Sequence, residues 1–204
     1  MKIGLIAITG MLSVAASGLT AAEIDSKVIH NYNYLGVGYE YLNDIADSDI
    51  DAHGVVGEFS FEKANFLFRA GGGYFWATDT GGADVDLWDV NASLGYVVRL
   101  VENHVNIIPR FTGAADGVDV EGSLFADYSW SILPGIELSY AINNQFAING
   151  GYTYAYNFDT EEEDHRFNVG GKVALLEQVG LAVNAQFSKE FGFSGITGMV
   201  EFHY

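Results

Sequence analysis

The most constraining feature of the sequence is an alternation of apolar and polar residues, with a period of two, that runs from Val28 to the C-terminus. Successive side chains of a β-strand point to opposite faces, so this period predicts strands with one apolar face. Ten segments carry it: 30–42, 53–62, 65–77, 85–98, 104–114, 123–140, 145–157, 165–175, 181–189 and 194–204. Most exceed the ~5–6 residues of ordinary strands and suit the ~9–11 residues of a tilted strand that crosses a bilayer.

The two faces of these segments differ in chemistry. One face carries no charged residue, and its aromatic side chains gather near the segment ends. Bilayer interfaces select two aromatic girdles around an apolar band, whereas the core of a soluble sandwich does not sort rings in this way. The pattern therefore favours a closed transmembrane barrel over a soluble all-β protein. One girdle comprises Tyr39, Tyr41, Tyr74, Trp76, Trp88, Tyr128, Trp130, Tyr152, Tyr154, Tyr156 and Phe167, and the other Phe59, Phe61, Phe66, Phe68, Tyr96, Tyr140, Phe146, Phe202 and Tyr204.

The connections between segments alternate in length. Those at 63–65, 99–103, 141–144 and 176–180 are short, whereas most of the others are longer and acidic. Short periplasmic turns and longer extracellular loops are typical of outer-membrane barrels, and an even number of strands places both termini on the side of the short turns.

The composition is strongly acidic yet apolar on average. The chain has 204 residues, 27 of them acidic and 9 basic, with a formal charge of -18, and its mean hydropathy is +0.14. Fifteen of the acidic residues lie in four of the longer connections, which concentrates the charge at one end of the expected barrel. The scarcity of basic residues argues against nucleic-acid binding, and the absence of cysteine excludes a disulfide framework.

The first residues have the order of a secretory signal. Lys2 supplies a positive start, an apolar stretch follows from Ile3 to Ala16, and small residues precede a cleavage site after Ala22. The apolar stretch falls short of the ~20 residues that a spanning helix needs. We therefore expect residues 1–22 to be removed, residues 23–29 to form a short periplasmic segment, and residues 30–204 to form the barrel.

The whole pattern resembles the small bacterial outer-membrane β-barrels, the class that includes OmpA membrane domains and OmpX- or OmpW-like proteins. The C-terminal residues are similar to the signal read by the barrel-assembly machinery, with Phe202 and Tyr204 in place and Met199 where glycine is usual. The resemblance implies an antiparallel up-and-down barrel in the outer membrane of a Gram-negative bacterium. It also implies a monomer without a cofactor, in contact with lipid, lipopolysaccharide and the assembly machinery.

The number of strands depends on two prolines. Pro109 and Pro134 lie inside predicted strands, where a missing N–H interrupts the ladder and usually marks a bulge. We expect ten strands with the fifth or sixth bent or shortened, and eight strands as the alternative.

The polar face carries charges of both signs. Inside a narrow barrel an unpaired charge is costly, so these side chains are expected to form paired, partly hydrated networks. One interpretation is a structural plug of ion pairs, and the other is a narrow hydrophilic path whose acidic excess favours cations. The predicted network comprises Glu40, Glu58, Glu62, Arg69, Asp89, Arg110, Asp127, Glu137, Arg166, Lys172 and Glu201.

Two loop motifs suggest chemistry. Asp84 and Asp86 precede one strand, and Glu163 and His165 precede another, which loosely resembles the paired acids and acid–histidine motif of omptin proteases. In that arrangement a histidine would activate water by general base catalysis. The alternative interpretation is a chance match among acidic loops.

A second acidic motif could bind a divalent cation. Asp47, Asp49 and Asp51 offer the oxygen ligands that Ca²⁺ prefers, although Ala52 stands where a calcium loop has its turn glycine. Three functions therefore remain open: a structural or surface-interaction role with acidic extracellular loops, a narrow porin-like channel for small hydrophilic solutes, and an omptin-like surface protease.

Overall fold

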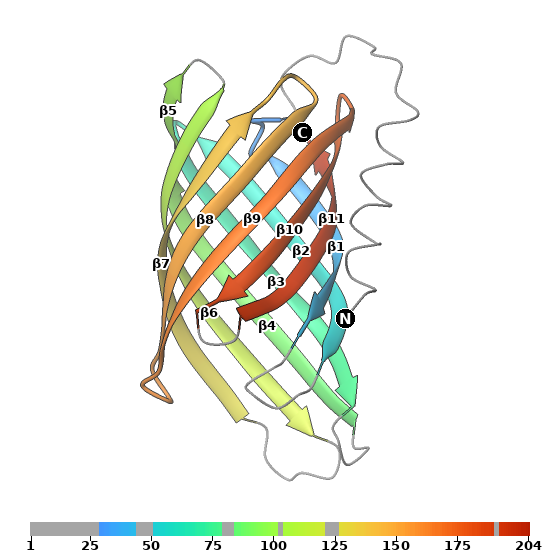
Figure 1. The fold of residues 1–204 in the computed structure, drawn as a ribbon, viewed down its shortest axis with the longest axis vertical. Coiled ribbons are helices and arrows are strands. Elements are labelled where there is room, and N and C mark those ends of the chain that lie inside the picture. Colours follow the sequence, from blue (N-terminus) through green and yellow to red (C-terminus); the bar gives the residue numbers. More distant parts are fainter. Residues whose placement is uncertain (1–28, 44–50, 79–83, 102–103, 121–126, 190–191) are drawn as a thin grey trace.

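The computed structural model describes residues 29–43, 51–78, 84–101, 104–120, 127–189 and 192–204 (Figure 1). All the regular elements that these residues form are β-strands, as the period-two pattern predicted. No helix in the described part of the chain is long and apolar enough to cross a membrane. The strands are β1 (Tyr34–Leu42), β2 (Ala52–Lys63), β3 (Phe66–Thr78), β4 (Asp84–Tyr96), β5 (Val98–Val101), β6 (Val105–Val120), β7 (Asp127–Ala141), β8 (Phe146–Asn157), β9 (Glu163–Leu176), β10 (Val179–Ser188) and β11 (Gly192–His203).

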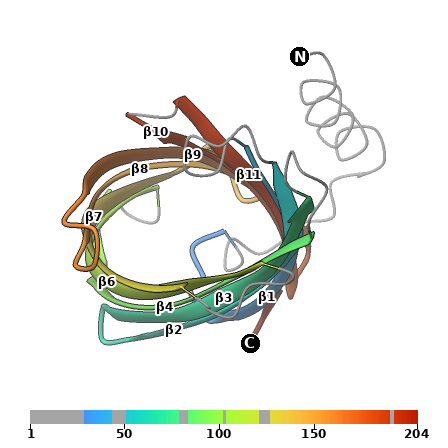
Figure 2. The ribbon, with the colours of Figure 1, turned by 90° about the horizontal axis from the view of Figure 1, so that it is seen from below.

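The strands form one closed antiparallel sheet. Apart from β4 and β5, which both pair with β6, each strand pairs with its neighbours in sequence, and β1 pairs with β11, so the described strands complete a ring (Figure 2). β4 and β5 are two parts of one crossing, because Gly95 faces Arg110 and Val98 faces Ile107 in the same register along β6. The described chain therefore runs along the length of the barrel ten times. This confirms the up-and-down barrel of ten strands and excludes the alternative of eight strands.

We expected a bulge or bend at the two prolines, and the ladder between their strands shows neither. Pro109 faces Ile136 and Phe111 faces Pro134 in a β6–β7 ladder that shows no register shift. Pro134 has a local effect only: the β7–β8 ladder skips Leu133 and Pro134 and then resumes in the same register. The ladder therefore loses two neighbouring pairings at this proline and forms no bulge.

The outer face of the barrel is apolar, as the alternation predicted. Leu94 is 59% exposed and Trp130 is 63% exposed, and large apolar side chains project outward from strands all around the ring. An exposed apolar band would be costly in water, and it fits the lipid-facing band of a transmembrane barrel.

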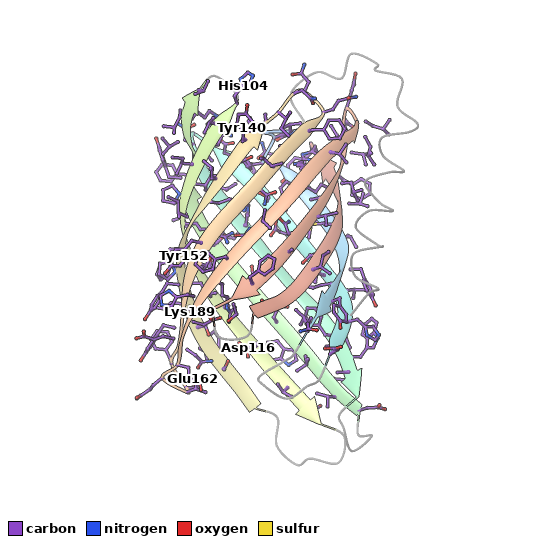
Figure 3. All side chains as sticks on the ribbon, in the orientation of Figure 1. His104, Asp116, Tyr140, Tyr152, Glu162 and Lys189 are labelled. Carbon is purple, nitrogen blue, oxygen red and sulfur yellow. The ribbon has the colours of Figure 1, made fainter. Side chains whose placement is uncertain are left out.

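The two ends of the barrel differ, and we name them by their connections. At the short-turn end, Ala64 and Asn65 alone join β2 to β3, with φ angles of 52° and 69°, the left-handed conformation of a two-residue hairpin turn. At the long-loop end, residues 158–162 connect β8 to β9. Figure 3 shows His104 and Tyr140 near the short-turn end and Asp116 and Glu162 toward the opposite end.

The segment before β1 departs from the expectation of a strand over 30–42. The strand begins only at Tyr34, and the preceding residues fold into the ring at the short-turn end (Figure 2). Ile29 and Tyr32 are 4% and 6% exposed. Ile29 packs with Ala141, Ala147 and Ala174, so the segment is part of the barrel interior.

Candidate functional site

The lumen contains a polar cavity of about 180 Å³. A barrel of about eight strands is just filled by side chains, so ten strands leave modest internal space. The cavity wall combines the ion pairs of the lumen with three asparagines, and the segment before β1 closes one side. Its lining residues are Ile29, Tyr32, Tyr34, Glu58, Arg69, Arg110, Glu137, Ser139, Ala147, Asn149, Asn168, Lys172, Ala182, Asn184, Thr197, Met199 and Glu201.

Two arginines share one carboxylate in this cavity. Arg69 on β3 donates hydrogen bonds of 2.8 Å and 3.4 Å to the two oxygens of Glu137 on β7. Arg110 on β6 lies farther off, with its Nη1 3.7 Å from Glu137 Oε2. Arg69 and Glu137 side chains are each 11% exposed, so the pair is largely shielded from water. The shared carboxylate cannot neutralise both guanidinium groups fully.

A second charged group joins β9 to β11. Lys172 forms an ion pair with Glu201, and His203 Nε2 lies 3.2 Å from the same carboxylate. The Lys172 ammonium also lies 5.3 Å from the centre of the Tyr34 ring. The Tyr34 hydroxyl in turn donates a hydrogen bond to Glu58.

Glycines make room for the asparagines of the opposite wall. Asn149 Nδ2 donates a 2.8 Å hydrogen bond to Asn184 Oδ1. The two strands that carry these residues flank Gly170, where an added Cβ would overlap the Asn184 amide oxygen. An added Cβ at Gly151 would likewise overlap Asn168. A side chain at either glycine would displace a polar group from the cavity wall.

The segment before β1 is held by specific polar contacts. Asn106 Nδ2 donates a 2.9 Å hydrogen bond to the Tyr32 hydroxyl, and the Arg69 guanidinium lies 5.9 Å from the centre of the Tyr32 ring. Asn33 accepts hydrogen bonds from the backbone N–H of Glu62, at 2.7 Å, and from that of Tyr204, at 3.2 Å. Tyr32 precedes the strands, and burial raises the pKa of its hydroxyl, so the group remains neutral at physiological pH.

The half of the lumen nearer the long-loop end is acidic. Asp89 faces Asp116 across the β4–β6 ladder, and Glu40 lies near the far end of β1, opposite Thr197. Ser129 Oγ donates a 2.8 Å hydrogen bond to Asp116, and Asn91 Nδ2 donates one of 3.3 Å to Asp89. Acids therefore outnumber bases in this half of the lumen, whereas the deeper cavity carries both signs.

The predicted lumen network is brought together only in part. Arg69, Arg110 and Glu137 form one group, and Lys172 and Glu201 form another. Arg166 instead pairs with Asp164 at 2.8 Å near the long-loop end of β9. Glu62 pairs with Arg99 at 2.7 Å near the short turns. The side chain of Asp127 lies outside the described residues.

The four residues of the omptin-like motif are not brought together. Asp84 and Asp86 begin β4, whose neighbours are β3 and β6, whereas His165 lies near the start of β9, between β8 and β10. His165 Nδ1 is 2.7 Å from the Tyr152 hydroxyl, and its ring also contacts that of Tyr154. Glu163 and His165 lie on β9, which three strands (β6, β7 and β8) separate from β4 along the shorter arc of the ring. The sequence motifs therefore do not form one site.

The predicted cation ligands fall mostly outside the described residues, since Asp47 and Asp49 lie in 44–50. Asp51 accepts a 2.6 Å hydrogen bond from the Tyr41 hydroxyl. The described residues include no group of three His, Cys, Asp or Glu side chains that could hold a metal ion.

The C-terminal residues close the seam of the barrel. Phe202 points outward and is 50% exposed, and Tyr204 donates a 3.3 Å hydrogen bond to the Ser60 carbonyl. Met199, at the position where the resembling signal has glycine, faces inward over Gly36. The role of Phe202 and Tyr204 as an assembly signal remains a prediction.

The fold matches solved outer-membrane barrels, although no protein-family model and no curated protein matches the sequence. The beta domain of the Bordetella autotransporter BrkA superposes with a TM-score of 0.50 at 9% identity, covering 85% of this chain and 100% of that one. The translocator domain of the autotransporter NalP from Neisseria meningitidis gives 0.47 at 9% identity, covering 98% and 96%. The KdgM porin gives 0.44 at 13% identity, covering 83% and 99%.

These identities support a likeness of fold alone. The chain has the fold of outer-membrane β-barrel proteins, which confirms the class that the sequence resembled. No subfamily within that class is distinguished.

Proposed function

We propose that the protein is an outer-membrane β-barrel with a structural or surface-interaction role, and that its lumen is closed to solute flow in the state described. The apolar outer face supports the membrane location. The short-turn end would face the periplasm and the long-loop end the exterior, where the acidic loops would meet lipopolysaccharide or partners. Insertion by the barrel-assembly machinery and a monomeric state belong to the same proposal.

The observation that carries a closed lumen is the segment before β1. Tyr32 and Ile29 fill the lumen beside the cavity and are almost fully buried. The acids of the outer half, Glu40, Asp89 and Asp116, add a second obstacle for anions, because like charges repel.

Conductance across a planar bilayer tests this proposal. The wild-type protein should be silent or nearly so, and the double variant Ile29→Gly, Tyr32→Ala should open measurable conductance. Tyr140→Ala is the matched control, because it removes an aromatic ring from the outer face. Steady wild-type conductance that the double variant does not change would contradict the closed lumen. It would favour the second candidate, a narrow porin-like channel, which the polar cavity supports.

A further inference from the structure

The cavity holds a positive charge without a close partner. Arg110 Nη1 is 3.7 Å from Glu137, and Nη2 makes only a long, 3.5 Å hydrogen bond to Thr153 Oγ1. Arg110 Nε is buried without a hydrogen-bond partner among the described residues. Because Glu137 is already engaged by both terminal nitrogens of Arg69, the guanidinium of Arg110 has donors to spare.

The same cavity holds a negative charge that no base neutralises directly. Glu58 on β2 lines the cavity and accepts a hydrogen bond from Tyr34, a neutral donor. Among the ion pairs of the described residues none involves Glu58, and the Arg69 charge acts on it only from a longer distance. Charges buried in a lumen are stabilised when a counter-charge and hydrogen bonds are supplied, so both Arg110 and Glu58 can accept a charged ligand group.

The rest of the wall offers neutral polar groups. Asn149, Asn168 and Asn184 present amides that both donate and accept hydrogen bonds. The hydrogen bond from Asn149 to Asn184 uses part of this capacity within the wall. Such a wall can bind the uncharged polar part of a ligand without adding net charge.

We propose that this cavity binds a small zwitterion of the amino-acid type, with its carboxylate on Arg110 and its ammonium group on Glu58. The acidic outer half of the lumen, with Glu40, Asp89 and Asp116, attracts the ammonium group and disfavours a lone anion. The asparagine wall contacts the remainder of the ligand. The inference does not depend on conductance, because a lumen closed to flow can still hold a bound solute.

Calorimetric titration of the full, folded protein in detergent micelles tests the proposal. The probes are glycine, 4-aminobutyrate and 6-aminohexanoate, which carry the same two charges at increasing separation. Butyrate and butylammonium each carry only one of the charges. At least one zwitterion should bind saturably, and the singly charged compounds should bind at least about tenfold more weakly. Equal binding of all five compounds, or no binding of any zwitterion, would overturn the proposal.

Substitutions separate ligand recognition from a structural role. Arg110→Gln and Glu58→Gln should each weaken zwitterion binding by about tenfold or more. Arg110→Gln should also shift selectivity toward butylammonium, and Glu58→Gln toward butyrate, because each leaves one unmet charge. Arg166→Gln is the matched control, since Arg166 pairs with Asp164 away from the cavity.

The folded state of each variant is checked by circular dichroism and by heat-modifiable electrophoretic mobility. If either cavity variant fails to fold, Arg110→Lys keeps the charge and should bind the zwitterion more weakly than the wild type does, because a lysine cannot make the paired hydrogen bonds of a guanidinium to a carboxylate. Folded variants that keep wild-type affinity and selectivity would refute the assignment of Arg110 and Glu58 to the ligand.

Discussion

Arg69 Nη1 lies 2.8 Å from Glu137 Oε2. This ion pair joins β3 to β7, although β4 and β6 lie between those two strands in the barrel wall. Removing the carboxylate by Glu137→Gln leaves two guanidinium groups without their shared partner. We expect the free energy of unfolding to fall by about 3 kcal/mol, because breaking a buried pair leaves an uncompensated charge. Urea unfolding of the barrel in lipid vesicles measures this loss.

Glu62→Gln is the control for that experiment. Its partner Arg99 is 36% exposed near the short turns, so the variant should lose no more than about 1 kcal/mol. Equal losses for Glu62→Gln and Glu137→Gln would show that the lumen pair carries no special stability.

The Tyr32 hydroxyl fixes the segment before β1. Tyr32→Phe leaves the buried Asn106 amide without this partner, so we expect a loss of about 1–3 kcal/mol in unfolding free energy. Tyr140→Phe, on the outer face, should change stability by less than about 0.5 kcal/mol. Thermal unfolding followed by electrophoretic mobility gives both values, and a wild-type midpoint for Tyr32→Phe would argue against the hydrogen bond.

Gly170 leaves space for the asparagine wall. Gly170→Ala places a Cβ against Asn184, and we expect it to destabilise the barrel by about 1–3 kcal/mol through overpacking. At Gly113 an added Cβ would meet no atom within 4 Å, so Gly113→Ala serves as the control and should be neutral or stabilising. The same urea titration compares the two variants. An unfolding midpoint for Gly170→Ala that equals or exceeds that of Gly113→Ala would contradict the prediction.

The depth of the lipid-facing band can be measured with arginine. Ala92 is exposed on the outer face between the rings of Trp88 and Tyr96, whereas Leu100 lies past Tyr96 toward the short turns. Ala92→Arg should cost about 2–4 kcal/mol and Leu100→Arg about 0–1 kcal/mol, because the cost of a charge depends on bilayer depth. Refolding yields and unfolding midpoints in vesicles measure both costs. A larger cost for Leu100→Arg than for Ala92→Arg would contradict the proposed position of the barrel in the membrane.

Much of the barrel wall could be predicted from the sequence because alternation reports directly on the two faces of a strand. Leu94 and Trp130 point outward, and Arg69 and Glu137 point inward, as the period-two pattern indicated. Some observed strand boundaries differ from the predicted ones by a few residues, because backbone hydrogen bonding continues beyond the apolar run. For example, β6 continues to Val120, whereas the predicted segment ends at residue 114.

The lumen was less predictable because it depends on which strands meet across the barrel. The pairing of Arg69 with Glu137 requires the register of several strands at once, which local periodicity does not give. Burial of Tyr32 was missed for a similar reason, although the asparagines on either side of it are residues that favour turns and interrupt a strand. The separation of Asp84 from His165 likewise follows from the order of the strands around the barrel. Each residue lies near the start of its own strand, and the sequence motif alone does not say how far apart those two strands lie on the rim.

The pairing of β1 with β11 has a consequence for the order in which the barrel assembles. Tyr34 faces His203 at this seam, so the first strand of the described chain, which pairs with β2 on one edge, finds the partner of its other edge only when the last strand is available. Until then β1 presents an open row of backbone donors and acceptors, which is a template for pairing with another chain. Holding that edge unpaired during synthesis and export is therefore a requirement that this topology imposes, and a contact this distant in sequence makes ring closure a late and slow event.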